Sequence, residues 1–279
     1  MKKYCYLFQA REKLPLFDRL RTEESDCFVL YFRNNIENDN EFYFPNSSWS
    51  QGRNKLLEFA ISKNIDYEYY IFADDDINLQ LKNGNEDSFR KLHELLNVYK
   101  PAVSFADYWW HLNCDKYPHI RKNEGIRIPI CYDACMNIFH KNAIKILLPY
   151  EDKFDNISWW WSQELLNHVS WDFYHNKLVQ FNELFLVNGI ADQTPYPRDF
   201  DLRQLNRIFI DYYVLSIKQT TIQHPLYPEN RSLELGPDSY IHDIPLDKYS
   251  LEFLTNYDLS HEYWTKKIEF WNKLGYKLK

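Results

Sequence analysis

The sequence has no long apolar run, and no apolar segment of signal-peptide length follows its amino-terminal lysines. The first residues, MKKYCYLFQAREKLPLF, reach Arg11 and Glu12 before an apolar stretch of signal-peptide length has formed. No later window approaches the roughly 20 uncharged apolar residues that a membrane-spanning helix needs. We therefore expect a soluble, cytoplasmic protein without a transmembrane segment. The Asn-x-Ser sequons at Asn46, Asn156 and Asn230 are then chance matches.

Cysteine pairs and basic clusters are also missing. The five cysteines form no C-x-x-C pair, so we expect reduced, buried thiols in a reducing compartment. Lys and Arg are scattered, and the formal charge is −7 at a sequence pI near 5.7. A nucleic-acid partner is therefore not expected, because binding to phosphate polymers needs a basic stripe.

Aromatic residues are abundant instead, at 18% of the chain, and include the runs YWW at 108–110 and WWW at 159–161. A hydrophobic core accounts for most of them. Flat apolar faces with polar edges also suit the C–H surfaces of sugar rings. An acidic, aromatic-rich chain of this kind favours a carbohydrate partner.

Strand-like and helix-like segments alternate in the first half of the chain, which predicts an α/β fold with a mixed, mostly parallel central sheet flanked by helices. We expect strands at 3–9, 27–32, 69–73 and 102–110, a helix at 53–63 preceded by Gly52, and a second helix that ends at Pro101. Segment 126–147 predicts two close strands and a helix, and the two strands suggest a mixed edge of the sheet. The later segments predict a helix at 158–177, a strand at 178–187, and helices at 202–218 and 260–275.

Three consecutive acids, Asp74, Asp75 and Asp76, follow the strand at 69–73 directly. Carboxylates this close repel one another, so they are either solvated or neutralised by a cation. Ligands bind at the carboxyl ends of strands in open α/β sheets. A D-x-D in this place can hold Mg²⁺ or Mn²⁺ through one or two carboxylates while phosphate oxygens and water fill the other positions. A helix cap with solvated neighbours is the alternative.

The order of the segments SQGRNKLLEFA (50–60), YIFADDDI (70–77), DACMNIFHKNAI (133–144) and WWWSQELL (159–166) resembles the GT-A glycosyltransferases. In that superfamily a G-R-N at a helix start precedes a strand ending in D-D or D-x-D, and a W-G-x-E/D segment follows later. The resemblance spans roughly residues 1 to 190. It implies one domain, in which 1–110 binds the nucleotide-sugar and 111–279 forms the acceptor half and the C-terminal helices.

The resemblance also implies roles on the donor side. Asp74 and Asp76 correspond to the D-x-D that handles the ribose and the metal, with Asp75 between them, and Arg53 corresponds to an arginine that helps to hold the nucleotide. A UDP-sugar donor and a Mn²⁺ or Mg²⁺ cofactor follow from the same resemblance. His224 is a candidate extra metal ligand, against a structural role.

On the acceptor side, Glu164 aligns with the acid of W-G-x-E and is the candidate general base of an inverting transfer. Serine replaces the glycine of that motif in this chain. Asp172 and Asp155 are the substitutes for the base. The candidate platforms for the glycan acceptor are Trp159, Trp160 and Trp161, against the alternative that they belong to the core. His140 is expected in a strand-to-helix turn.

Other function classes remain as alternatives. A sugar nucleotidyltransferase should carry a Gly-rich loop after its first strand, but the segment here is AREKLPLF. A two-metal phosphohydrolase or nuclease would draw further acids and histidines from several strand ends. A non-catalytic carbohydrate-binding protein is the third alternative.

Overall fold

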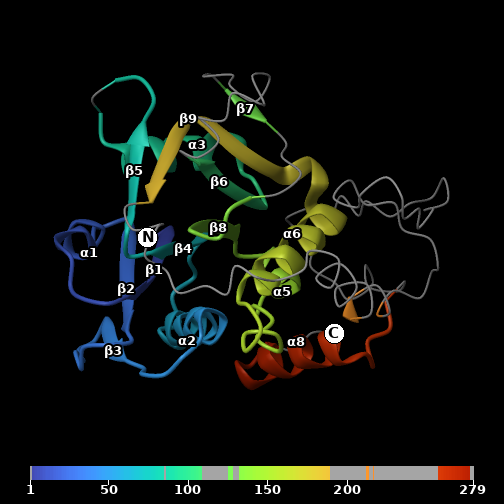
Figure 1. Cartoon of the computed structure of the whole chain (residues 1–279). Coiled ribbons are helices and arrows are strands. Elements are labelled where there is room, and N and C mark those ends of the chain that lie inside the picture. The colour runs from blue at the N-terminus through green and yellow to red at the C-terminus, as the bar shows by residue number, and fades with distance from the viewer. Residues whose placement is uncertain are drawn as a thin grey trace.

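The computed structural model describes residues 2–84, 86–108, 125–127, 132–188, 212–213, 216 and 257–276 (Figure 1). The strands are β1 (Tyr4–Ala10), β2 (Ser25–Tyr31), β3 (Glu41–Tyr43), β4 (Tyr69–Asp74), β5 (Ile77–Leu81), β6 (Val103–Tyr108), β7 (Ile126–Arg127), β8 (Met136–His140) and β9 (Leu178–Asn188). The helices are α1 (Pro15–Arg19), α2 (Trp49–Ser62), α3 (Ser88–Tyr99), α5 (Ile144–Leu147), α6 (Trp160–Tyr174), the 3₁₀ helix η2 (His175–Lys177) and α8 (Glu262–Lys273).

One mixed sheet runs through the described part of the chain, in the order β3-β2-β1-β4-β8-β6-β9-β5, with β7 paired to β9. The pairs among β1 to β4 are parallel, and β6 and β9 are also parallel. β8 is antiparallel to both β4 and β6, and β5 and β7 are antiparallel to β9. Most strands therefore run in one direction, which confirms the predicted α/β class with its mixed, mostly parallel sheet.

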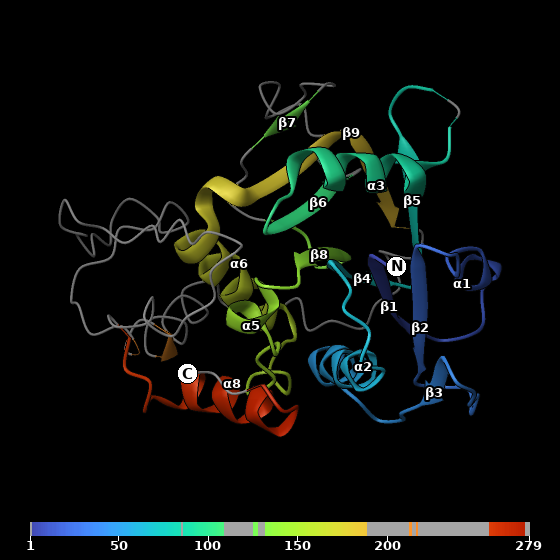
Figure 2. The same cartoon turned by 180° about the vertical axis from the view of Figure 1, so that it is seen from behind.

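Helices cover both faces of the sheet because successive strand side chains point to opposite sides. On β1, Tyr4, Tyr6 and Phe8 join a core cluster with α1 and α3, whereas Cys5 and Leu7 join a cluster with α2, α5, α6 and α8. Figures 1 and 2 show α3 on one side of the central strands and α2, α5 and α8 on the other. The result is a three-layer α/β/α arrangement.

Helix α2 begins earlier than the sequence suggested. Ser48 is the N-cap and forms a capping box with Gln51, so the first turn lies before Arg53 and Gly52 is inside the helix. A Cβ on Gly52 would lie 2.4 Å from Cδ and Nε2 of the Gln9 side chain at the end of β1. Gly52 thus allows the first turn of α2 to approach β1 closely, and this approach brings the following arginine to the end of β4.

Two further predictions about the sheet need correction. A strand, β5, follows the acids directly and pairs with β9 at the sheet edge, where no strand was predicted. β8 was expected at a mixed edge but lies between β4 and β6. Short apolar segments have no edge or centre signature of their own, so their pairing depends on the rest of the sheet.

Most other elements match the predictions. The helices α3, α6 and α8 and the strands β1, β2, β4, β6, β8 and β9 are confirmed to within a few residues, and His140 ends β8 before a turn. Most of the helix predicted at 202–218 lies outside the described residues. Cys5, Cys27 and Cys135 are free and buried, as expected, and Cys114 and Cys131 lie outside the described residues. No helix in the described ranges has the length and apolarity needed to cross a bilayer.

Gly52→Ala should lower the free energy of unfolding by up to about 2 kcal/mol, because overpacking against the Gln9 amide costs about 1–3 kcal/mol and exceeds the roughly 1 kcal/mol by which Ala favours a helix over Gly. Thermal and urea unfolding measure the change. In a Gln9→Ala background the clash is gone, so the same substitution should stabilise the fold. An effect of the same sign in both backgrounds would contradict the close approach of α2 to β1.

Candidate functional site at the carboxyl end of β4

The acid triplet lies where β4 ends and a short turn leads into β5. Asp74 is the last residue of β4, and Asp75 and Asp76 form the turn. β4 lies between β1 and β8, with Gln9 of β1 in register with Asp74. The Asp74 N–H donates to the carbonyl oxygen of Cys135, just before β8, at 3.0 Å. The acids therefore lie at the carboxyl ends of the parallel strands, where α/β folds bind ligands.

Asp74 is neutralised by Arg53, a buried cation on α2. Arg53 is 1% exposed; its Nη2 donates to Asp74 Oδ1 at 2.8 Å and to the Ala134 carbonyl at 2.9 Å. Its Nη1 donates to Asn137 Oδ1 at 3.2 Å and to the Tyr150 hydroxyl oxygen at 3.3 Å. Burial raises the pKa of Asp74 to about 6, although Arg53 lowers it. The structure thus gives Arg53 the task of holding Asp74, and its contact with a nucleotide stays a prediction.

Asp75 is neutralised by Arg11, the first residue after β1. Arg11 Nε and Nη2 donate to the two carboxylate oxygens of Asp75 at 3.0 Å each, and the Arg11 backbone N–H donates to Asp75 Oδ2 at 2.7 Å. Arg11 was not among the residues predicted from the sequence. Its place directly after a strand was a usable signal, because the ends of adjacent parallel strands meet at one sheet edge.

Asp76 makes the longest of these ion pairs, with 3.8 Å between its Oδ2 and Arg11 Nη2. Its side chain is 13% exposed. Burial, together with the charge of Asp75, raises the pKa of Asp76, and Arg11 lowers it. Of the three acids, Asp76 therefore has the carboxylate that an incoming cation can reach with the least disruption of existing contacts.

A row of tryptophans extends from Asp74 to the start of α6. The indole N–H of Trp49 donates to Asp74 Oδ1 at 3.3 Å, and the guanidinium carbon of Arg53 lies 4.0 Å from the centre of the Trp49 ring. The Trp159 ring centroid is 4.8 Å from that of Trp49, and Trp160 meets Trp159 edge-on at 5.5 Å. Two of the predicted acceptor platforms, both partly exposed, therefore lie close to the acid triplet.

Trp161 has a different environment. It is 5% exposed, and its ring lies 6.3 Å from that of Phe154. This burial favours the alternative that Trp161 belongs to the core. Trp161 lies on the side of α6 that packs against the core, because a helix between a sheet and solvent buries one of its sides.

Glu164 lies near the start of α6 and is partly exposed. Burial of its carboxyl raises the pKa to about 7; the charge of Asp133 also raises it, and hydrogen bonds with Trp160 and Asn167 lower it. A carboxyl with this pKa is half ionised near neutral pH. It can therefore accept a proton and release it again under ordinary conditions.

Segment 132–135, just before β8, connects Glu164 to the acid triplet. Gln163, next to Glu164, donates from Nε2 to the Tyr132 carbonyl at 3.1 Å. The carbonyls at the other end of the segment accept hydrogen bonds from the Arg53 guanidinium and from the backbone at the end of β4. Asp74 and the helical turn that carries Glu164 are thus attached to the same short piece of chain.

The substitute base Asp155 has a structural contact. It accepts hydrogen bonds from the hydroxyls of Ser48 and Ser50 at the start of α2, the latter at 2.9 Å. Burial raises the pKa of Asp155 to about 6, although both serines lower it. This carboxylate holds the 150–155 region against α2.

The other substitute, Asp172, is buried farther along α6, about 12 Å from Glu164 at 1.5 Å per residue. It accepts a hydrogen bond from the Tyr213 hydroxyl at 2.7 Å. Burial raises the pKa of Asp172 to about 7. Its position favours a structural role.

The described residues contain no group of three or more His, Cys, Asp and Glu side chains that could hold a metal ion. His224, the predicted extra ligand, lies outside these residues.

Asp172→Asn should raise the free energy of unfolding at both pH 8 and pH 5. The gain at pH 8 should exceed the gain at pH 5 by about 1–3 kcal/mol. The folded-state pKa of about 7 lies above the unfolded value of about 3.9. The native carboxyl therefore contributes stability below pH 4 that is lost as the pH rises through 7. Asparagine keeps an acceptor for Tyr213 without the charge. Urea unfolding at both pH values measures the gain, and the exposed Glu94→Gln is the control. An equal gain at pH 5 and pH 8 would contradict the raised pKa of Asp172.

Comparisons with known proteins give little sequence likeness. No protein-family model matches the chain. No curated protein matches it either.

Two solved structures align with part of this chain. A197 from STIV aligns with a TM-score of 0.39 and 14% identity, over 65% of this chain and 83% of that one. S. aureus TarS 1-349 aligns with a TM-score of 0.44 and 10% identity, over 75% of this chain and 64% of that one, so this chain spans less than two thirds of its length.

Proposed function

We propose that this protein is a glycosyltransferase that moves a sugar from a nucleotide-sugar donor, a UDP-sugar, to a hydroxyl of an oligosaccharide or glycan acceptor. The observation that carries the proposal is that segment 132–135 accepts hydrogen bonds both from Asp74 at the end of β4 and from Gln163, the neighbour of Glu164 on α6. Glycosyl transfer needs a place for a diphosphate leaving group and a base for the attacking hydroxyl. The order of motifs that resembles the GT-A enzymes supports the same assignment.

The donor side is the turn that carries Asp74, Asp75 and Asp76, with Arg11 beside it. A diphosphate brings charge of the same sign as the acids, so it needs a cation at this place. The Arg11 guanidinium is 29% exposed, and its Nη2 lies 3.8 Å from Asp76 Oδ2. It can hydrogen-bond phosphate oxygens while Arg53 keeps Asp74 in position.

The acids fit a divalent cation that is shared with the diphosphate. Asp76 and Asp74 would hold Mn²⁺ or Mg²⁺ through carboxylate oxygens, which these hard cations prefer. The long ion pair of Asp76 with Arg11 is consistent with such a ligand. When bound, the ion would offset the charge that builds up on the departing nucleoside diphosphate.

On the acceptor side, Glu164 in its ionised form takes the proton from the acceptor hydroxyl as that oxygen attacks C1 of the donor sugar. The nucleoside diphosphate leaves from the opposite face, so one displacement inverts the anomeric configuration. Trp159 and Trp160 offer apolar ring faces between Glu164 and the acids, on which an acceptor sugar can lie. The burial that raises the pKa of Glu164 also makes it a stronger base than an exposed carboxylate.

UDP should bind more weakly when divalent cations are removed, because the acids would then face the diphosphate with like charge. Titration calorimetry in Mn²⁺ and in EDTA measures the difference for the unmodified chain, for Asp76→Asn and for the control Glu94→Gln. The control should keep the Mn²⁺ dependence and Asp76→Asn should lose it. Equal affinity in EDTA and Mn²⁺ would overturn the shared cation, and no UDP binding in either would overturn the choice of donor.

Glu164→Gln should lower the turnover number by roughly 10²–10⁴-fold, since it keeps the size of the side chain but removes the proton acceptor. UDP affinity should barely change. The turnover number of the unmodified chain should rise with pH, with its half-point near the pKa of about 7, because the base works in its ionised form.

The matched variants are Asp172→Asn and Asp155→Asn, with the product linkage determined by NMR. Both should keep far more activity than Glu164→Gln. If one of them is inactive while Glu164→Gln turns over normally, the base is assigned to the wrong residue. A retained anomer would show that the mechanism is not a single displacement.

A further inference from the structure

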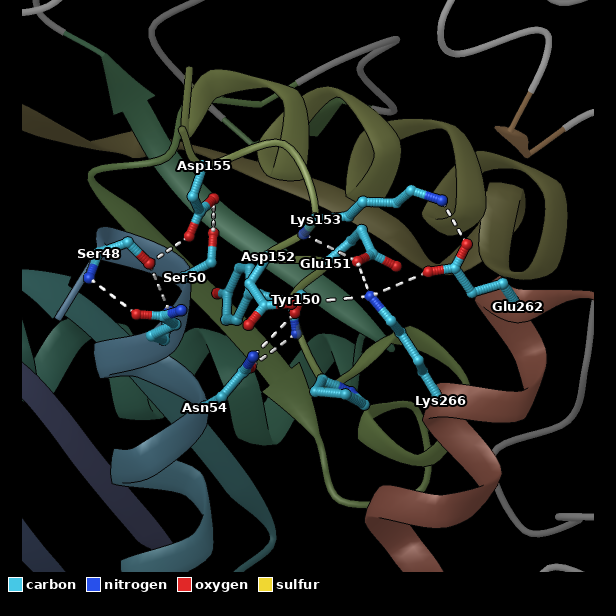
Figure 3. A network of polar contacts seen from close by, with 12 residues as sticks. Ser48, Ser50, Asn54, Tyr150, Glu151, Asp152, Lys153, Asp155, Glu262 and Lys266 are labelled. Atoms are coloured by element: carbon cyan, nitrogen blue, oxygen red, sulfur yellow. Dashed lines mark hydrogen bonds and ion pairs between the residues drawn. The ribbon is translucent and has the colours of Figure 1, made fainter. Parts of the chain in front are cut away.

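A cavity of about 470 Å³ lies between α2, the residues before α6, and α8. It is lined by α2 residues on the side away from Arg53, by residues 149–152, and by residues of α8. Figure 3 shows Asn54 of α2 and Lys266 of α8 directed toward the 150–152 segment from opposite sides. Its volume is in the range of small-molecule binding sites. The acid triplet and Glu164 are not among its lining residues.

The walls of this cavity are held by hydrogen bonds at several points. Asn54 donates from Nδ2 to the Tyr150 carbonyl at 2.8 Å and accepts from the Tyr150 N–H at 2.7 Å. Lys266 Nζ donates to Glu151 Oε1 at 3.0 Å. Lys267 Nζ donates to the carbonyls of Leu147 and Pro149 at 2.6 and 3.1 Å. A cavity with walls fixed in this way is formed before any ligand arrives.

The side chains that line the cavity give it no excess of positive charge. Three lysines face three carboxylates, and these side chains are Lys55, Lys266, Lys267, Glu58, Glu151 and Asp152. Burial also lowers the pKa of Lys267 to about 7. Lys55 pairs with Glu58 at 3.1 Å, and Lys266 lies 3.0 Å from Glu151 and 3.9 Å from Asp152. An anionic ligand would have to compete with these carboxylates for each cation, so the balance favours a neutral ligand.

The cavity combines ring faces with hydrogen-bonding groups. Phe44, after β3, and Phe270, on α8, line it and are both partly exposed. Near them are Asp152, with 40% of its side chain exposed, and the exposed Gln51. Carboxylate and amide groups bind vicinal hydroxyls, whereas aromatic faces suit C–H surfaces. A neutral molecule with both kinds of surface is a sugar ring.

We propose that this cavity is a second carbohydrate-binding site, which holds a neutral sugar residue away from the acid triplet. Phe270 and Phe44 provide the apolar surface, and Asp152 and Gln51 provide hydrogen bonds to hydroxyls. Tyr150 separates the two sites: it lines the cavity and its hydroxyl contacts Arg53 and Asn137 on the other side. The proposal rests on the cavity itself and does not require glycosyl transfer.

Saturation-transfer NMR tests the site with D-glucose, D-galactose and N-acetyl-D-glucosamine as probes on the full chain. Transfer to at least one sugar is expected, and Asp152→Ala and Phe270→Ala should each weaken its binding roughly tenfold, the equivalent of ~1.4 kcal/mol. The matched control is Glu94→Ala, an exposed acid on α3 at the opposite face of the sheet, which should leave the transfer unchanged. Circular dichroism checks the fold, and the exposed Asp152 keeps the test valid if Phe270→Ala does not fold.

Two further measurements test where the sugar binds. One uses Asp76→Asn, and the other adds UDP and Mn²⁺ to the unmodified chain. Both should leave the sugar signal in place if the sugar occupies the cavity. Loss of the signal in either case would move the sugar to the acid triplet and overturn the second site. The absence of transfer to all three sugars, or a signal that survives Asp152→Ala, would also overturn it. The sugar signal and its response to Asp152→Ala do not depend on whether UDP binding or Glu164 behaves as proposed, and Asp76→Asn tests the location without UDP.

Discussion

The buried ion pair between Arg53 and Asp74 is the contact on which the rest of the site depends. One guanidinium joins α2 to the end of β4, to the residues before β8 and to Tyr150. A cation with this degree of burial is stable only while its partners stay in place, because removal of one leaves an uncompensated charge. The position of Asp74, and with it the geometry of the turn after β4, follows from this requirement.

The residues after α5 extend this arrangement to the far side of α2. The backbone of Tyr150 exchanges two hydrogen bonds with Asn54, and Asp155 accepts from the serines at the start of the same helix. Lys266 then ties α8 to Glu151, as Figure 3 shows. One stretch of chain therefore orients the helix that carries Arg53 and also forms a wall of the cavity beside α8.

Burial raises the pKa of four carboxyls, but these carboxyls differ in their contacts and in their access to a substrate. It raises the pKa of Asp74 and Asp155 to about 6 and of Glu164 and Asp172 to about 7. Asp172 is held by a tyrosine, and Asp74 is held by an arginine. Glu164 keeps partial exposure beside Trp160. A raised pKa marks a candidate for proton transfer only where the carboxyl can also be reached by a substrate.

The α/β class and the place of the acids could be predicted from the amino-acid sequence. Alternating apolar patterns predicted most strands and helices, and an apolar strand that runs into three acids predicted their position at a sheet edge. These signals are local, because they depend on periods of two and 3.6 residues along the chain.

Contacts between residues far apart in the chain could not be predicted in this way. The partner of Asp75 is Arg11, 64 positions earlier, and β8 lies at the centre of the sheet because two distant strands pair with it. The tryptophan run also divided, with Trp159 beside Trp49 and Trp161 in the core. Which cation meets which acid, and which face of a helix is covered, depend on how elements far apart in sequence pack together, and no local pattern encodes that.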